Sequence, residues 1–385
     1  MFTVTRLPSV FFGLLSLPQV DRGKVSMIAY YVSAHGYGHG VRASAIVRAL
    51  NQAYPNVPIT IISALPEAFL SNRLTKQAPV SFRSAQFDLG MVQLDSIRVD
   101  VPATLREISK IYAGRDETVV REVDYLREQE VRVVVTDIPA MPLEAASKAG
   151  IPGIAVGNFA WNWIYSDFLD QDERWQAIIH ALEEGYRTCS LLLKLPFSEP
   201  MSVFPVKEEV PLLASCGDNR RDAMAKHTGA DPAKRWLLLS FTALNWSDRA
   251  LASVRALDEY EFFTVKPLDW QGGNIHAIDR ADVAFSDVLA SVEAVISKPG
   301  FGILSECVVN KKPLIYAERE DFVEYPILEE AIQRYLRHVH VPAEKLYAGD
   351  LRDALDAIWR TPDVADTLPN GGDAIAAQRI HDFIK

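Results

Sequence analysis

Cysteine is scarce in this sequence. Cys189, Cys216 and Cys307 are the only three among 385 residues, and no two of them form a C-x-x-C pair. An odd number of widely separated cysteines argues against a disulfide framework and against a zinc ribbon. Reduced thiols in a cytoplasmic protein are the simplest interpretation.

Long hydrophobic runs are missing too. No stretch of about 20 apolar residues is free of charge and proline, so we expect no membrane-spanning helix. Val10–Leu17 resembles the apolar part of a signal peptide, but Pro8 and Pro18 flank it and no A-x-A cleavage site follows. Because a strand pattern begins at Met27, we expect residues 1–26 to be an extension outside the folded domains.

An excess of positive charge is also absent. The 40 Lys and Arg residues are outnumbered by 50 Asp and Glu residues, which gives a formal net charge of −10. A strongly basic face for nucleic acid or anionic lipid is therefore not expected. One segment, 65–115, is weakly amphipathic and is the sole candidate for membrane contact, but it is not strongly basic.

The sequence does contain a regular alternation of apolar, strand-like segments and helical segments. Continuous apolar strands between helices predict an α/β fold, with parallel strands covered on both faces. The predicted strands are 27–33, 58–63, 131–136, 152–156, 191–195, 236–241, 260–266, 294–297 and 313–317. The predicted helices are 41–53, 104–128, 142–149, 172–187, 302–309, 325–334, 350–359 and 374–383.

A proline-rich, polar stretch at 196–232 interrupts this alternation. We therefore predict a first domain at 27–205, a second domain at 206–368, and a C-terminal helix within 369–385 that packs back toward the first domain. Two α/β domains in tandem predict a ligand cleft between them.

A first glycine-rich loop follows the first predicted strand. Its spacing from Gly36 to Gly40 is G-x-G-x-G, which differs from the G-x-G-x-x-G of dinucleotide-binding folds, and the G-K-[ST] of a P-loop is absent. Glycine here, Gly38 in particular, lets the backbone approach a ligand closely. A tight turn requires glycine but does not require histidine. His35 and His39 are therefore candidates for proton transfer.

A second glycine-rich loop follows the predicted strand 294–297 and leads into a helix. Gly300 and Gly302 would expose backbone amides at the helix N-terminus, which suits a diphosphate, and Lys298 could add a cation. Glu306 falls one turn into this helix. It could bind two neighbouring hydroxyl groups or, alternatively, complement the helix dipole.

Together the two loops resemble those of the GT-B glycosyltransferases of the family 1 and family 28 type. The pattern S-x-x-G-x-x-x-x-S-E from Ser297 to Glu306, then Pro313 and Asp321-x-x-Glu324, resembles their donor-site signature. These families usually have Gln or Asn at the last two positions. Two carboxylates there would bind sugar hydroxyls or indicate an altered donor.

A closer resemblance covers about residues 27–340. The segments Tyr30–His39, Asp137–Pro139, Val156–Tyr165 and Ser297–Gly302 resemble the glycosyltransferase-like N-terminal region of plant L-arabinokinases and its free-standing bacterial relatives. The sequence contains no counterpart of the kinase half. Sugar phosphorylation is therefore not implied.

The resemblance implies a GT-B fold, in which two Rossmann-like domains face a central cleft. It also implies metal-independent, inverting transfer of a sugar from a nucleoside-diphosphate sugar, expected to be a UDP-sugar, to an acceptor hydroxyl, with no further cofactor. His39 would be the general base, with His35 as the alternative. The nucleotide base would lie near Phe241–Ala243 or Phe285. The residues expected to contact the donor are Gly38, Phe241, Thr242, Phe285, Ser297, Lys298, Gly300, Phe301, Gly302, Ser305, Glu306, Asp321 and Glu324.

Several alternatives stay open. Asp137 could orient the histidine, bind the acceptor, or cap the helix 142–149. Trp161 is expected in the cleft. Asp170-Gln171-Asp172 spells a D-x-D string but lies at a helix start, where acids complement the dipole, so we expect no metal site. A nucleotide-sugar epimerase or hydrolase, for which Asp321 and Glu324 would supply carboxylates, and a non-catalytic sugar-nucleotide-binding protein are the competing functions.

Overall fold

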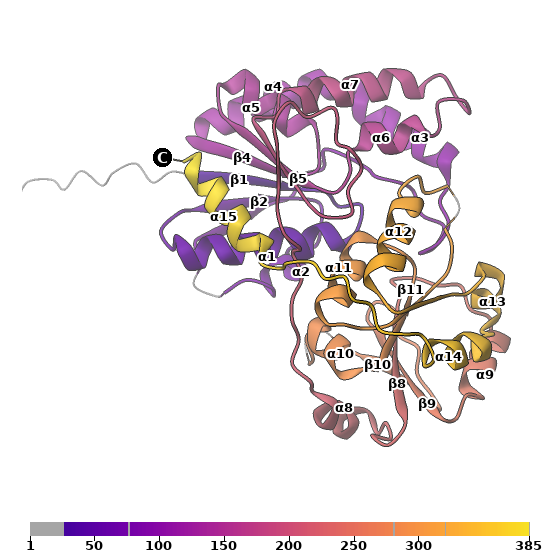
Figure 1. Ribbon diagram of the computed structural model, residues 1–385. Helices are drawn as coiled ribbons and strands as arrows, with labels where there is room; N and C mark the ends of the chain where they lie inside the picture. Colours follow the sequence, from indigo (N-terminus) through magenta and orange to yellow (C-terminus); the bar gives the residue numbers. More distant parts are fainter. Residues whose placement is uncertain (1–26, 76–77, 280–281, 320, 385) are drawn as a thin grey trace, which may run out of the picture.

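The protein consists of two α/β domains, each built on one parallel sheet (Figure 1). A computed structural model describes residues 27–75, 78–279, 282–319 and 321–384. The expectation for residues 1–26 falls outside the described residues.

The first domain contains a seven-stranded sheet in the order β3-β2-β1-β4-β5-β6-β7. Its central strands are almost fully buried, as predicted from their unbroken apolar sequences, whereas the strands at the two edges are partly exposed. The strands are β1 (Met27–Val32), β2 (Ile59–Ile62), β3 (Val80–Arg83), β4 (Val131–Asp137), β5 (Gly153–Gly157), β6 (Leu191–Lys194) and β7 (Lys207–Glu209). The helices are α1 (Tyr37–Ala53), α2 (Glu67–Ser71), α3 (Val101–Ala113), α4 (Arg115–Glu128), α5 (Met141–Ala149), α6 (Trp161–Ser166) and α7 (Trp175–Arg187).

The second domain contains a six-stranded sheet in the order β10-β9-β8-β11-β12-β13. Its strands are β8 (Arg235–Ser240), β9 (Tyr260–Val265), β10 (Ile275–Ile278), β11 (Ala294–Ser297), β12 (Leu314–Tyr316) and β13 (His338–His340). Its helices are α8 (Arg221–Thr228), α9 (Asp248–Arg255), α10 (Phe285–Ser291), α11 (Phe301–Val309), α12 (Tyr325–Tyr335), α13 (Ala343–Ala348) and α14 (Arg352–Ile358). The last helix, α15 (Gly372–Asp382), lies against α1 of the first domain (Figure 1).

Three element predictions need correction. The helix predicted at 104–128 is two helices, α3 and α4, which meet at Gly114. The apolar positions keep helical spacing across this residue, so the pattern hides the break. The segment predicted as a connection contains β7, which extends the first sheet past residue 205, and α8. α1 begins at Tyr37 instead of 41, so His39 lies in the first turn of a helix.

A loop of the first domain between β3 and α3 reaches across to the second domain. The side chain of Ile97 is 2% exposed and packs in the core formed by β8, β9 and their helices. The Ser96 amide donates to the carbonyl oxygen of Ala243 at 3.1 Å, and the Tyr347 hydroxyl donates to Asp95 at 2.8 Å. The two domains are therefore joined by specific contacts next to β8 as well as by the chain itself.

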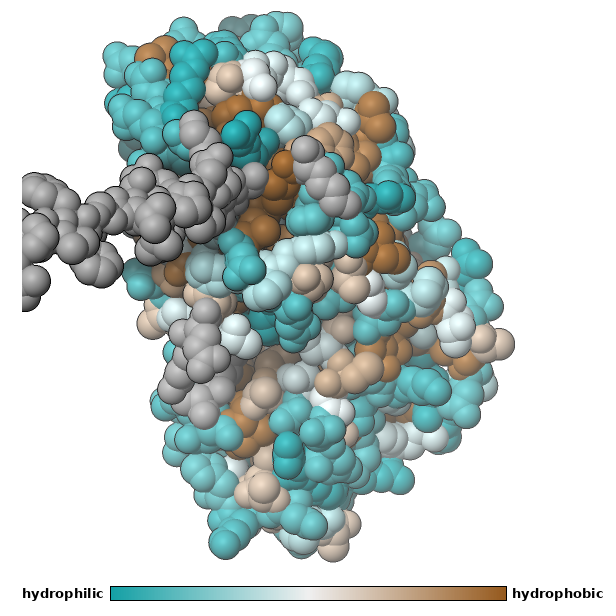
Figure 2. Space-filling view, turned by 90° about the vertical axis from the view of Figure 1, so that its left-hand side faces the viewer, coloured by the Kyte–Doolittle hydropathy of each residue, from teal (hydrophilic) through white to brown (hydrophobic). Residues whose placement is uncertain are grey.

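Hydrophilic residues make up much of the surface (Figure 2). Figure 2 shows one face of the molecule on which hydrophilic side chains predominate and hydrophobic ones form separate patches. Cys189 and Cys307 are buried free thiols, and Cys216 is an exposed one. Within the described part of the chain, no helix combines the length and apolar character needed to cross a membrane.

Two glycines that end helices provide a matched test of packing in the second domain. Gly229 and Gly349 both have left-handed φ angles, of +78° and +69°. A methyl group at Gly349 would overlap the backbone oxygen of Ala250, whereas one at Gly229 would meet nothing within 4 Å. We expect Gly229→Ala to lower the free energy of unfolding by about 1–2 kcal/mol. Gly349→Ala should lower it by about 1–3 kcal/mol more, because the overlap adds to the strain. Urea unfolding measures both, and equal losses would contradict the close packing of α13 against α9.

Candidate functional site

A cavity of about 670 Å³ lies between the two domains. Residues that follow β1 and β5 line it from the first domain, and residues that follow β8, β11 and β12 line it from the second. In each sheet the strand order reverses at this place, between β1 and β4 and between β8 and β11. The carboxyl ends of parallel strands at such a reversal are where α/β folds bind ligands. All of the predicted site residues line the cavity except Asp137, which lies behind His39.

The first glycine loop provides an imidazole–carboxylate pair. His39 lies in the first turn of α1, and its Nδ1 is 2.7 Å from Oδ1 of Asp137, the last residue of β4. Asp137 accepts this hydrogen bond as a fully buried carboxylate. With Nδ1 donating, Nε2 of His39 is the basic nitrogen, and it makes no hydrogen bond to any described residue.

Arg42 holds Asp137 in place. Its Nε and Nη2 each donate to Asp137 at 2.6 Å, and its Nη1 donates to Oδ1 of Asn158 at 2.6 Å. Burial by itself would raise the pKa of Asp137, but the charge and hydrogen bonds of Arg42 outweigh this effect and lower it. The carboxylate is thus ionised, and it can stabilise an imidazolium at His39.

His35 differs from His39 in its hydrogen-bond partner and in the charges around it. Its Nδ1 accepts a hydrogen bond from the Met91 amide at 3.1 Å, and its ring meets Trp161 edge-on at 5.1 Å. Burial, together with the positive groups His39, Lys298 and Arg319, lowers the pKa of His35 to about 3. His35 is therefore neutral near pH 7, and with Nδ1 as acceptor its proton is on Nε2.

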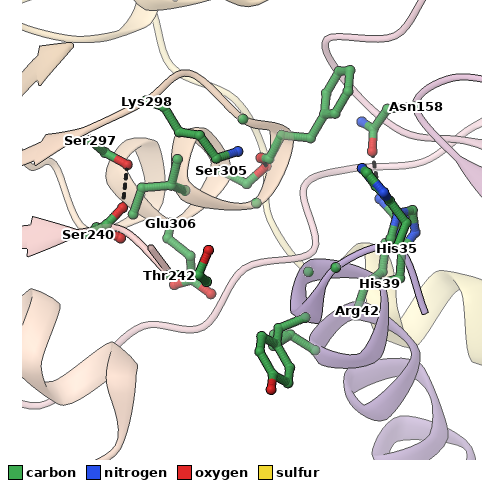
Figure 3. A pocket seen from close by; sticks show the side chains of 18 of the residues that line it. His35, His39, Arg42, Asn158, Ser240, Thr242, Ser297, Lys298, Ser305 and Glu306 are labelled. Carbon is green, nitrogen blue, oxygen red and sulfur yellow. Dashed lines mark hydrogen bonds between the residues drawn. The ribbon is translucent and has the colours of Figure 1, made fainter. Parts of the chain in front are cut away.

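The second glycine loop has the form expected of an anion site. Gly300 is the N-cap of α11 and offers no side chain to the first amides of the helix. Lys298 extends from the end of β11 toward the side of His35 and His39 (Figure 3). Burial, and secondarily the charge of Arg319, lower the pKa of Lys298 to about 7. A negatively charged ligand would restore its full charge.

The predicted hydroxyl-binding carboxylate faces the same cavity. Glu306 accepts a long hydrogen bond of 3.4 Å from the Ser215 amide through Oε1, and its Oε2 is buried without a partner. Burial raises the pKa of Glu306 to about 7. A ligand with two adjacent hydroxyls would satisfy this carboxylate and favour its ionised form.

The residues predicted near the nucleotide base differ in exposure. Phe241 is buried in the core of the second domain, while Thr242 is exposed toward the cavity and Phe285 is half-buried. The hydroxyls of Ser297 and Ser305 donate to backbone oxygens, at 2.8 Å each, of Ser240 and Phe301. The first of these bonds is drawn in Figure 3.

Phe301, the aromatic residue in the second glycine loop, bridges the cleft. Its ring stacks on Phe159 of the first domain, with centroids 5.6 Å apart and planes inclined by 26°. Trp161 is 2% exposed and lines the cavity, as predicted, and its indole donates to Asp88 at 2.9 Å.

Two arginines of the site were missed from the sequence. Arg42 is three residues after His39, and this spacing on one helix face was the available signal. Arg319 follows β12, and it lies near Glu324, whose Oε1 is 3.5 Å from its Nη1. Of the two predicted donor-sugar carboxylates, Glu324 therefore has a partner, while Asp321 is exposed with a φ of +57°.

The D-x-D string lies outside this site. Asp172 pairs with Arg174 on the surface, at 2.6 Å. Across the described residues, no three His, Cys, Asp or Glu side chains lie close enough together to hold a metal ion.

One curated protein shows similarity along most of this chain. L-arabinokinase of Arabidopsis thaliana is 26% identical over 361 residues, which are 91% of this chain and 34% of that protein. The chain thus spans about a third of the length of its relative. No protein-family model matches the chain.

Solved structures with the same fold are glycosyltransferases. The glycotransferase of kitacinnamycin covers 94% of this chain and 100% of its own, with a TM-score of 0.59 and 15% identity. A UDP-glucosyltransferase from Polygonum tinctorium covers 93% and 98%, with a TM-score of 0.59 and 14% identity. A UGT from Siraitia grosvenorii in complex with UDP covers 94% and 100%, with a TM-score of 0.57 and 12% identity. The chain has the GT-B fold, which confirms the prediction from its sequence.

Glu306 generates a prediction about stability. The folded chain holds its pKa near 7 instead of the usual 4.5, so folding keeps a proton on a group that the unfolded chain loses. The free energy of unfolding should therefore fall as pH rises from about 4.5 to 7 and then level off. Glu306→Gln removes this penalty, which is about 3 kcal/mol at most.

Thermal melting at several pH values tests this. The variant should melt at a higher temperature than the unmodified protein at pH 8 and at the same temperature at pH 4.5. Exposed Glu128→Gln serves as the control and should show no such gain. A variant that is less stable at pH 8 would mean that the Glu306 carboxylate is satisfied inside the protein.

Proposed function

We propose that this protein is a metal-independent, inverting glycosyltransferase that moves a sugar from a nucleoside-diphosphate sugar to an acceptor hydroxyl. The observation that carries the proposal is the opposition of two groups across one cavity. His39, paired with Asp137, lines the first-domain side, and the N-terminus of α11 with Lys298 lines the other.

The first-domain side would activate the acceptor. The acceptor hydroxyl would lie next to Nε2 of His39 and give up its proton there as its oxygen attacks the anomeric carbon. Asp137 would stabilise the resulting imidazolium, and Arg42 would keep the carboxylate in position. A positioned base of this kind contributes about 10²–10⁴-fold to rate.

The second-domain side would hold the leaving group. As the bond between the anomeric carbon and the diphosphate oxygen breaks, its electron pair stays on the phosphate. The uncapped amides at the start of α11 and the Lys298 ammonium would donate hydrogen bonds to this developing charge. Glu306 would bind the ribose hydroxyls.

His35 is proposed to donate a hydrogen bond, because its proton is on Nε2 when Nδ1 accepts from the Met91 amide. This arrangement favours His39 over His35 as the base. UDP is the first nucleotide to test, since one structure with this fold contains it and another is described as a UDP-glucosyltransferase.

Removal of the proposed base is the kinetic test. We expect His39→Ala to lower the rate of UDP release from a UDP-sugar by about 10²–10⁴-fold, with little change in KM for the donor. His35→Gln keeps an acceptor for the Met91 amide and should cost less than about tenfold, the worth of one neutral hydrogen bond. If turnover persists in His39→Ala, His39 is not the base, and hydrolysis or epimerisation without an acceptor becomes the better assignment.

Nucleotide binding is tested separately. UDP at one hundred times its Kd should stabilise the folded chain by about 2.7 kcal/mol and raise Tm. Glu306→Gln should weaken UDP binding about tenfold or more, because a charge-assisted pair of hydrogen bonds to the ribose is lost. Absence of any shift with UDP, GDP, ADP and TDP would overturn the donor site.

A further inference from the structure

Two cations, a half-buried lysine and a buried arginine, lie on the donor side of the cavity. Lys298 follows β11 and Arg319 follows β12, and these strands are neighbours in the sheet. Both residues line the cavity, and Arg319 is only 7% exposed. A diphosphate bound by the amides of α11 and by Lys298 would leave Arg319 without a ligand group to bind.

The hydrogen bonds of Arg319 are long and incomplete. Its Nη1 is 3.4 Å from the Pro299 oxygen and 3.5 Å from Oε1 of Glu324, beyond the usual 2.7–2.9 Å or so of charged pairs. Its Nε is buried and has no acceptor among the described residues. Phe322 lies against the guanidinium, 3.0 Å from Cζ to the ring centroid.

The protein supplies few hydrogen-bond partners to these two side chains. Lys298 makes no hydrogen bond or ion pair with any described residue. Glu324 is the carboxylate in contact with Arg319, and its Oε2 is itself buried without a partner. Buried charges of this kind are costly unless a ligand completes them.

Arg319 also lies close to where the sugar would be transferred. It contacts the second glycine loop at Pro299, and its ring partner Phe322 packs into the aromatic cluster of the first domain. Its charge reaches His35 on the opposite wall of the cavity. A sugar bound between the diphosphate and His39 would therefore lie beside the guanidinium.

A neutral sugar fits this environment poorly. The sugar ring becomes positively charged, like an oxocarbenium ion, as its anomeric bond breaks. A guanidinium that is 3.5 Å from its carboxylate partner, Glu324, would oppose that change. A carboxylate on the sugar would pair with the guanidinium and remove the conflict.

We propose that the transferred sugar is a uronic acid and that Arg319 binds its carboxylate, while Lys298 faces the diphosphate. This inference rests on the proposed function. The planar guanidinium matches a carboxylate in shape and charge. Oε2 of Glu324 would accept a hydrogen bond from a neighbouring sugar hydroxyl.

Calorimetric titration of the full chain with UDP, UDP-glucose and UDP-glucuronate tests the proposal. The unmodified protein should bind UDP-glucuronate about tenfold or more tightly than UDP-glucose, the effect of a charged hydrogen-bonded pair. The double variant Arg319→Gln, Glu324→Gln should bind the two sugars equally while its affinity for UDP stays within about threefold. Glu324→Gln alone is the matched control and should keep the preference for the uronate.

The other outcomes are distinguishable. If the double variant loses the same factor for all three ligands, Arg319 binds the diphosphate and the proposal is wrong. If UDP binds but UDP-glucuronate binds no better than UDP-glucose, the proposal of a uronic acid is wrong, while the proposal of a nucleotide-sugar site still holds. If UDP does not bind, both proposals fail. A melting curve for each variant shows whether it is folded.

Discussion

The geometry of the cleft depends on the buried ion pair between Asp137 and Arg42. It joins the carboxyl end of β4 to the first helix, and through Asn158 it reaches the end of β5. Removing one partner of such a pair typically costs about 3–5 kcal/mol, because the other is left buried and charged. The Asp137 carboxylate also accepts the hydrogen bond from Nδ1 of His39, which leaves Nε2 as the basic nitrogen. Asp137 therefore contributes both to the stability of the first domain and to the protonation state of the site.

In the second domain, by contrast, the charged groups of the site are not paired so completely within the protein. Arg319 is buried and Lys298 and Glu306 are half-buried, all three with too few partners inside the protein, and their removal from water shifts the pKa of each toward its neutral form. These groups destabilise the empty fold. Binding sites often give up stability in this way, because the missing interactions are those that the ligand provides. In a chain with a net charge of −10, cations with incomplete hydrogen bonding at a cavity point more clearly to an anionic ligand than they would in a basic chain.

The sequence predicted the layered α/β fold well, because buried parallel strands give unbroken apolar runs. It also located both glycine loops at the ends of the correct strands. The break at Gly114 and the short strand β7 were missed, since neither changes the local apolar pattern.

Local sequence patterns, namely a glycine loop or a helix start, were enough to predict His39, Glu306 and Lys298 as site residues. Asp137 was open to three roles, and its contact with His39 spans 98 positions in the sequence. Arg319 carries no motif. Its placement depends on the packing of Phe322 against the other domain, which no local pattern encodes.

The loop between β3 and α3 has a consequence for the timing of events in a catalytic cycle. One end of it positions His35 through the Met91 amide, and the other end is bonded to Ala243, next to Thr242 at the cavity wall. Separation of the domains would break the bonds at Ser96 and Asp95, but Gly90 and Val92, on either side of Met91, would stay bonded to Tyr165 and Thr104 of the first domain. Widening the cleft would therefore open the cavity while His35 keeps its position, so that the first-domain wall stays arranged when the domains separate.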